Sequence, residues 1–137
     1  MDKLSLSIEH VQPNAPGARV LVVDDNHDAA DSTAMLLELA GYETRAVYSG
    51  VEVLSSLETY APDILVLDIG LPDLTGFELA RQVKEAGSAA CLIALSGFTQ
   101  QQYQQQATAA GFDAYLLKPV EPEALEKVIA GLMQKRR

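Results

Sequence analysis

The fold is decided by the stretch Ile64-Leu65-Val66-Leu67-Asp68-Ile69-Gly70-Leu71-Pro72. Its four leading apolar residues are too few for a membrane span and are typical of a strand buried on both faces of a sheet. Gly70 and Pro72 then turn the chain. Asp68 therefore lies at the carboxyl end of the strand, where open α/β sheets carry ligands and chemistry. Taken alone, this acid is either a reacting group or the cap of the next helix.

Four further apolar runs lie on either side of this strand, and a helical stretch follows each run. The five predicted strands cover residues 20–23, 43–47, 64–67, 91–95 and 113–117. The predicted helices lie at residues 28–40, near 51–61, at 75–86, in a glutamine-rich stretch ending at 110, and near 125–133. Strands and helices that alternate in this way form right-handed crossovers and a parallel sheet covered on both faces. We therefore predict an α/β fold of the flavodoxin-like class, a doubly wound (βα)5 parallel sheet with strand order 2-1-3-4-5.

Helical spacing predicts which side chains face the sheet. The second predicted helix carries apolar residues at helical intervals: Val51, Leu54, Leu57 and Ala61. The last helix has the clearest apolar face: Leu125, Val128, Ile129, Leu132 and Met133. The lone Cys91 lies inside an apolar run, which indicates a buried free thiol.

Composition and charge narrow the class of protein. A chain of 137 residues with 48% hydrophobic and 21% charged residues is typical of one globular domain. No apolar run approaches the ~18 residues of a membrane helix, and the first residues lack the apolar core of a signal peptide, so a cytoplasmic location is expected. The net charge of -9 argues against direct nucleic-acid binding. His10 and His27 have no metal-ligand spacing and are interpreted as surface residues.

Residues 1–18 form a segment apart from the domain predicted at 19–137. A linker composition over residues 13–17 separates the two. Leu4, Leu6 and Ile8 alternate with polar residues, which is the period of a half-buried strand. We favour a tail or linker, while an added edge strand and the remnant of a preceding domain stay open.

Polar side chains from four predicted strands meet at one edge of the sheet. They are Asp24, Asp25, Asp68, Ser96 and Lys118. The predicted order makes the first and third strands neighbours, so the three aspartates share one crevice. Three carboxylates at about 4 Å repel by roughly 4 kcal/mol per pair at an effective dielectric near 20, and that cost implies a compensating cation. Hard oxygen ligands in a small site favour Mg²⁺.

This set of side chains is suited to phosphoryl transfer. A carboxylate beside Mg²⁺ is a competent nucleophile, and Asp68 would form an aspartyl phosphate. Lys118 supplies a point charge for one phosphoryl oxygen. Ser96 supplies a hydroxyl that can donate to another.

Four motifs, in this order and spacing, closely resemble the receiver domain of two-component response regulators. They are Val22-Val23-Asp24-Asp25, Leu67-Asp68-Ile69-Gly70-Leu71-Pro72, Ala94-Leu95-Ser96-Gly97 and Leu117-Lys118-Pro119. The resemblance covers residues from about 19 to 133. The residues in these motifs are similar to those of receivers attached to hybrid histidine kinases.

The resemblance implies a role for each site residue. Asp68 accepts the phosphoryl group from a histidine kinase or a histidine phosphotransfer protein. Asp25 ligates Mg²⁺ directly, Asp24 assists through water, and Asp68 and the backbone carbonyl of Gly70 complete the protein ligands.

The resemblance also implies a switch and a cis peptide. Ser96 and Tyr115 take the switch positions, and the peptide bond before Pro119 is cis. A downstream protein would dock on the face made by the fourth helix, the fifth strand and the fifth helix. No independent enzyme is expected beyond self-phosphorylation and self-dephosphorylation, unless the segment belongs to a histidine kinase polypeptide.

Several alternatives stay open at this point. Asp24 and Asp25 have a second interpretation as helix caps, Ser96 as a turn serine and Tyr115 as core. A partner surface and a solvated face both fit the glutamine-rich helix after Phe98. An FMN-binding protein of this fold and an aspartyl-phosphate phosphatase are remote, since the first loop is acidic and Gly70 takes the place of the phosphatase's second acid. A stand-alone regulator and the excised receiver of a hybrid kinase share the same chemistry.

Overall fold

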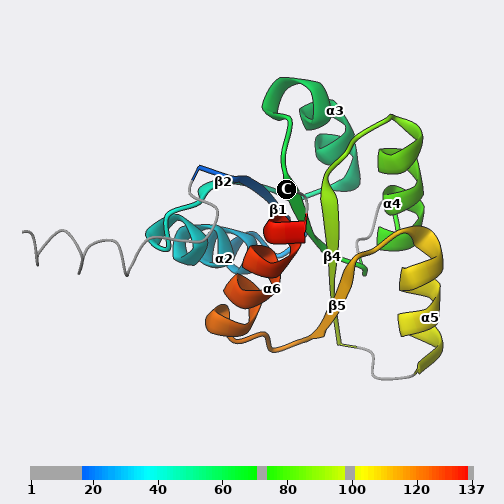
Figure 1. Ribbon diagram of the computed structural model, residues 1–137. Helices are drawn as coiled ribbons and strands as arrows, with labels where there is room; N and C mark the ends of the chain where they lie inside the picture. Colours follow the sequence, from blue (N-terminus) through cyan, green and yellow to red (C-terminus); the bar gives the residue numbers. More distant parts are fainter. Residues whose placement is uncertain (1–16, 71–73, 98–100, 136–137) are drawn as a thin grey trace, which may run out of the picture.

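The computed structural model describes residues 17–70, 74–97 and 101–135, with the side chain of residue 101 left out (Figure 1). One sheet of five parallel strands forms its centre, in the order β2-β1-β3-β4-β5. The strands are β1 (Arg19–Val23), β2 (Glu43–Val47), β3 (Ile64–Asp68), β4 (Cys91–Ser96) and β5 (Ala114–Leu117). The order is the one predicted, and the flavodoxin-like doubly wound fold is confirmed.

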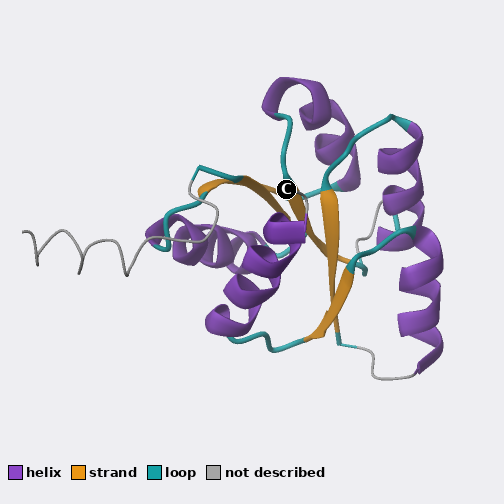
Figure 2. Ribbon diagram, viewed as in Figure 1, coloured by secondary structure: helices purple, strands orange, loops and turns teal. Residues whose placement is uncertain are grey.

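Helices cover both faces of the sheet, as Figure 2 shows. They are α2 (His27–Leu39), α3 (Gly50–Tyr60), α4 (Gly76–Glu85), α5 (Gln101–Ala110) and α6 (Pro122–Lys135). Helices α2 and α6 pack on one face, and α3, α4 and α5 pack on the other. No helix in the described part of the chain is long and apolar enough to span a bilayer.

An apolar core lies on each face of the sheet, and alternate residues of each strand belong to one core or to the other. Leu21 and Leu65 face the layer of α3, α4 and α5, while Val20 and Ile64 face the layer of α2 and α6. Successive strand side chains point to opposite faces, so a strand that is covered on both sides needs apolar residues at every position. This need explains the unbroken apolar runs in the sequence.

The helix starts and ends follow the expected local chemistry. Ser49 caps α3 by accepting a hydrogen bond from the backbone N–H of Glu52, and Thr75 caps α4 in the same way. Gly41, at φ 107°, follows α2 in the left-handed conformation, as predicted for its C-terminal end.

Two expectations about burial are wrong. On α3 the fully buried apolar side chain is Val53, whereas Val51 is 68% exposed and Ala61 ends the helix in the left-handed conformation. Cys91 is half-buried rather than buried, because it is the first residue of β4. The predicted tail lies mostly outside the described residues, but Ala18 is buried and accepts a backbone hydrogen bond from Glu43.

Gly76 makes a close approach that shapes the end of β3. A Cβ atom on Gly76 would lie 2.5 Å from the Cα atom of Ile69. The Gly76 N–H also donates to the Ile69 carbonyl at 3.1 Å. The first turn of α4 therefore rests directly on the residue that follows Asp68.

Candidate functional site

An acidic cluster lies at the carboxyl edge of the sheet, between β1 and β3. Val23 is paired with Leu67 across these strands, so Asp24 and Asp68 come next to each other. Each of Asp24, Asp25 and Asp68 offers a carboxylate oxygen, and these oxygens all lie within 4.8 Å of one another. The cluster therefore brings together the three acids predicted from the strand ends.

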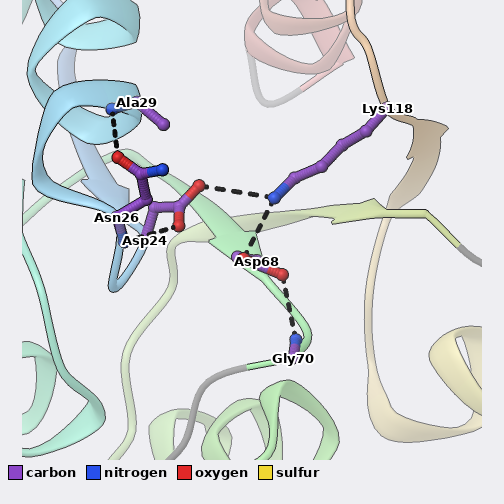
Figure 3. A network of polar contacts seen from close by, with 6 residues as sticks. All are labelled: Asp24, Asn26, Ala29, Asp68, Gly70 and Lys118. Atoms are coloured by element: carbon purple, nitrogen blue, oxygen red, sulfur yellow. Dashed lines mark hydrogen bonds and ion pairs between the residues drawn. The ribbon is translucent and has the colours of Figure 1, made fainter.

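Lys118 reaches this cluster from β5, two strands away from β3. Its Nζ atom lies 3.0 Å from Oδ2 of Asp68 and 3.4 Å from Oδ2 of Asp24 (Figure 3). The Lys118 backbone N–H donates to the Ser96 carbonyl at 2.8 Å, and the Lys118–Pro119 peptide bond is cis, as expected. A single ammonium therefore bridges two of the three carboxylates.

Strand parity explains why these side chains meet. Asp24 continues the alternation of Val20 and Val22, and Asp68 continues that of Ile64 and Val66. Both acids are thus directed to the face covered by α2 and α6. Lys118 continues the alternation of Ala114 and Leu116, which also pack on that face, so the three charges converge.

The loop after β1 is fixed by its own hydrogen bonds. Oδ1 of Asp24 accepts from the Asn26 N–H at 3.0 Å. The Asn26 side chain in turn accepts from the Ala29 N–H at 3.0 Å and is the N-cap of α2 (Figure 3). The interpretation of Asp24 and Asp25 as the caps of α2 is therefore wrong, since Asn26 has that role.

The Asp68 carboxylate is held at both oxygens. Oδ1 accepts from the Gly70 N–H at 2.9 Å, and Oδ2 pairs with Lys118. The side chain is 15% exposed, so it is shielded yet reachable from solvent. These two contacts leave one carboxylate oxygen facing the Lys118 ammonium.

Burial and pairing act in opposite directions on the charges. Burial raises the pKa of Asp24, and the Asn26 N–H and the Lys118 ammonium only partly offset that effect. Burial lowers the pKa of Lys118, but its hydrogen bond to Asp68 and the charges of Asp68 and Asp24 outweigh burial and raise it. Three acids facing one ammonium leave the site negative, which suits a hard divalent cation.

Ser96 and Tyr115 lie on neighbouring strands next to the acids. Ser96 is 1% exposed at the end of β4 and is paired with Leu117, while Tyr115 is paired with Ala94. Tyr115 is half-buried and packs on the core under α3, α4 and α5. By parity Ser96 is directed to that same face, so the two residues share a side of the sheet. Phe98 lies outside the described residues.

One contact beside the cluster was missed by the reasoning from sequence. The rings of His27 and Tyr48 stack with centroids 3.8 Å apart and planes 16° apart. The Tyr48 hydroxyl donates to Oδ1 of Asp31 at 2.6 Å. No motif marks this contact, because it joins the first residue of α2 to the loop after β2, and only the folded sheet brings these together. His27 is exposed, as expected.

Comparison with known proteins gives a consistent result. A family model described as "Response regulator receiver domain" matches residues 20–130. The response regulator MprA of Mycobacterium avium is 35% identical over 112 residues, which cover 82% of this chain and 48% of MprA. The chain thus spans about half the length of that relative.

Two further matches cover most of both chains. An uncharacterized 14.6 kDa protein of Leptolyngbya boryana is 37% identical over 112 residues, covering 80% of this chain and 86% of that protein. The crystal structure of a CheY-like response regulator receiver domain protein from Methanospirillum hungatei matches with a TM-score of 0.81 and 31% identity. That match covers 87% of this chain and 95% of the other.

Proposed function

The chain belongs to the response regulator receiver domain family of two-component systems, and on that basis we propose that Asp68 accepts a phosphoryl group in a Mg²⁺-dependent reaction. The donor is the phosphohistidine of a histidine kinase or a histidine phosphotransfer protein, the partners of response regulator receivers. The observation that carries the proposal is the Asp68 carboxylate, which lies within the acidic cluster and pairs with Lys118.

The acidic cluster fits a magnesium ion. Its carboxylate oxygens come from two adjacent strand ends and lie close enough together to share one small cation. Asp25 would bind it directly, Asp24 would assist through water, and Asp68 and the Gly70 carbonyl would complete the protein ligands. When bound, the ion supplies positive charge to the phosphoryl oxygens and offsets repulsion among the carboxylates.

Asp68 is the nucleophile of the transfer. One carboxylate oxygen gives an electron pair to phosphorus, and the P–N bond to the donor imidazole breaks with its electron pair going to nitrogen. The Gly70 N–H holds the other carboxylate oxygen and so fixes the direction of attack. Lys118 lies beside Asp68 Oδ2 and is placed to hold an oxygen of the incoming phosphoryl group.

The signal would leave through Ser96 and Tyr115. The buried Ser96 hydroxyl would donate to a phosphoryl oxygen, and the half-buried Tyr115 would turn into the space that this movement opens. A downstream protein would then dock on the face of α5, β5 and α6. The same chemistry serves a stand-alone regulator and a receiver that belongs to a hybrid histidine kinase.

Labelling with a small phosphodonor tests the assignment. The chain, given Mg²⁺ and acetyl phosphate, should gain one acid-labile phosphoryl group by intact mass, and Asp68→Asn should gain none. Asp28→Asn is the matched control, because Asp28 is an exposed acid in the first turn of α2 outside the cluster. Labelling of Asp68→Asn at the level of the parent would refute the assignment of Asp68.

A further inference from the structure

The position of Asp25 depends on its loop rather than on contacts of its own side chain. Asp25 is exposed, and its carboxylate makes no hydrogen bond or ion pair with any residue in the ranges that the structure describes. Asp24, by contrast, is tied to the Asn26 N–H and to Lys118. Because Mg²⁺ demands a near-ideal arrangement of its ligands, the placement of Asp25 rests on whatever holds the backbone at either side of it.

From these contacts we infer that Tyr48 is a positioning residue for the metal site. Its ring stacks on His27, two residues after Asp25, and its hydroxyl binds Asp31 on the next turn of α2. The inference rests on the proposed function, because it concerns the same Mg²⁺ site.

The contact with α2 has two points. His27 and Asp31 are four residues apart, so both lie on one side of the helix. The Tyr48 ring covers the first of them at a centroid distance of 3.8 Å, and its hydroxyl donates to the second at 2.6 Å. Tyr48 therefore fixes the first turn of α2, which follows directly from the loop of the acids.

The other side of Tyr48 is itself anchored. Its backbone N–H donates to Oε1 of Glu52 at 2.6 Å, while the Glu52 N–H donates to the Ser49 hydroxyl at 3.3 Å. The Ser49 cap sets the start of α3, and the Glu52 side chain ties the Tyr48 backbone to that first turn. The preceding residue, Val47, accepts the Asp24 N–H at 3.3 Å.

Asp25 is thus held between two attachments to one short segment. Asp24 is bonded to Val47 on one side of it, and His27 is stacked on Tyr48 on the other. Removing the ring leaves the first attachment and frees the second. The expected result is a looser Asp25 and a weaker magnesium site, with the cluster residues themselves unchanged.

Magnesium titration of the whole chain tests this inference. At one fixed pH, Mg²⁺ binding is followed by isothermal titration and by the backbone amide signals of Asn26 and Gly70. Groups that orient metal ligands typically change affinity by about tenfold or more, so Tyr48→Ala should raise the Kd for Mg²⁺ about tenfold. Tyr48→Phe keeps the ring and loses the bond to Asp31, and should have an intermediate Kd.

Two comparisons separate positioning from general loss of stability. Tyr103→Ala removes another half-buried tyrosine, on α5, and should leave the Kd unchanged even if it lowers the melting temperature. His27→Ala removes the stack but keeps the bond from Tyr48 to Asp31, so its Kd should lie between those of the parent and Tyr48→Ala. The double variant should bind Mg²⁺ no more weakly than Tyr48→Ala alone, since both substitutions remove the same stack.

The outcomes distinguish this inference from the proposed function. A parent chain that binds no Mg²⁺ would overturn both. A parent that binds Mg²⁺ with a Kd matched within twofold by Tyr48→Ala would overturn the positioning role alone. If His27→Ala and Tyr48→Ala raised the Kd for Mg²⁺ additively, the stack between the two rings would not be the contact that positions Asp25. A tenfold, non-additive loss in folded variants supports the inference.

Discussion

Burial of Asp24 makes the metal-free site sensitive to pH. The residue is 6% exposed, and burial raises its pKa above the usual value of 3.8, with the Asn26 N–H and Lys118 only partly opposing this. The folded state therefore keeps the Asp24 proton at pH values where the unfolded chain has lost it. Without metal, the contribution of Asp24 to the free energy of unfolding falls as pH rises from about 3.8 through the raised pKa.

Asp24→Asn should remove this dependence. Across that pH window the free energy of unfolding of the variant should rise relative to the parent, by at most about 1.4 kcal/mol per pH unit. With Mg²⁺ present the trend should reverse, because the ion favours the ionised parent. Urea unfolding at several pH values, with Mg²⁺ and with EDTA, checks both trends. Parallel pH curves for the two proteins would contradict the prediction.

At the scale of single residues, the sequence predicts positions better than contacts. Strand ends and strand order were enough to bring Asp24, Asp25 and Asp68 together. The bridge from Lys118 to both Asp24 and Asp68 was not predicted, since it depends on how far a flexible side chain reaches. The same limit applies to the stacking of Tyr48, because its partner, His27, belongs to α2, a separate element of the fold.

Among the elements, the junction of β3 and α4 is the least tolerant of added volume. Gly76→Ala would place a methyl group 2.5 Å from the Cα atom of Ile69, so the turn must move. We expect a loss of about 1–3 kcal/mol in the free energy of unfolding. Because Ile69 follows Asp68 directly, the rate of labelling by acetyl phosphate should fall as well.

Gly131→Ala is the control for this substitution. Gly131 lies inside α6, and a Cβ atom there would meet nothing within 4 Å. Alanine should therefore raise the free energy of unfolding by roughly 0.5–1 kcal/mol through its higher helix propensity, with labelling unchanged. Chemical denaturation of both variants measures the change in the free energy of unfolding, which should be a loss for Gly76→Ala and a gain for Gly131→Ala. Equal changes in the free energy of unfolding for the two variants would show that the close contact with Ile69 does not destabilise Gly76→Ala.

The elements also show where periodicity is insufficient. On α3, Leu54 and Leu57 pack against the same core as Val53 and Tyr60. Val51 fits the same helical spacing but is exposed. The phase is decided by the Ser49 cap, which sets the first turn, and by the Tyr60 hydroxyl, which donates to the Glu43 carbonyl at 3.0 Å. Neither contact can be deduced from hydrophobic spacing alone.

Across the whole molecule, the acidic cluster and Tyr115 lie on opposite faces of the sheet. The charges of Asp68 and Lys118 are directed toward α2 and α6, whereas Tyr115 packs under α3, α4 and α5. In the proposed mechanism, a signal from Asp68 to Tyr115 must therefore cross from one face of the sheet to the other. Ser96 is buried at the end of β4, the strand between β3 and β5, and is directed to the same face as Tyr115.

Ser96→Ala should uncouple the two faces in part. A charge-assisted hydrogen bond contributes about 1.5–3 kcal/mol, whereas a complete switch from 1:99 to 99:1 requires about 5.5 kcal/mol. The variant should still be phosphorylated at Asp68, with smaller phosphorylation-dependent NMR shifts at Tyr115 and α5. Ser55→Ala, an exposed serine on α3, should keep the shifts of the parent. Phosphorylation-dependent shifts in Ser96→Ala as large as those of the parent would show that Ser96 does not couple Asp68 to Tyr115.

The bridge made by Lys118 also has a consequence for the newly synthesised chain. Lys118 is 50 positions after Asp68 and 94 after Asp24, and β4 is the one strand that β5 pairs with among the described residues. At about 5–20 residues per second, translation needs about 2.5–10 s to pass from Asp68 to Lys118, a separation of 50 positions. Throughout that interval a nascent chain carries the acids without the ammonium that balances them. On the proposed function, a ribosome-bound fragment that ends before Lys118 therefore lacks one group of the acceptor site, and it should accept phosphoryl groups more poorly than a chain that includes Lys118.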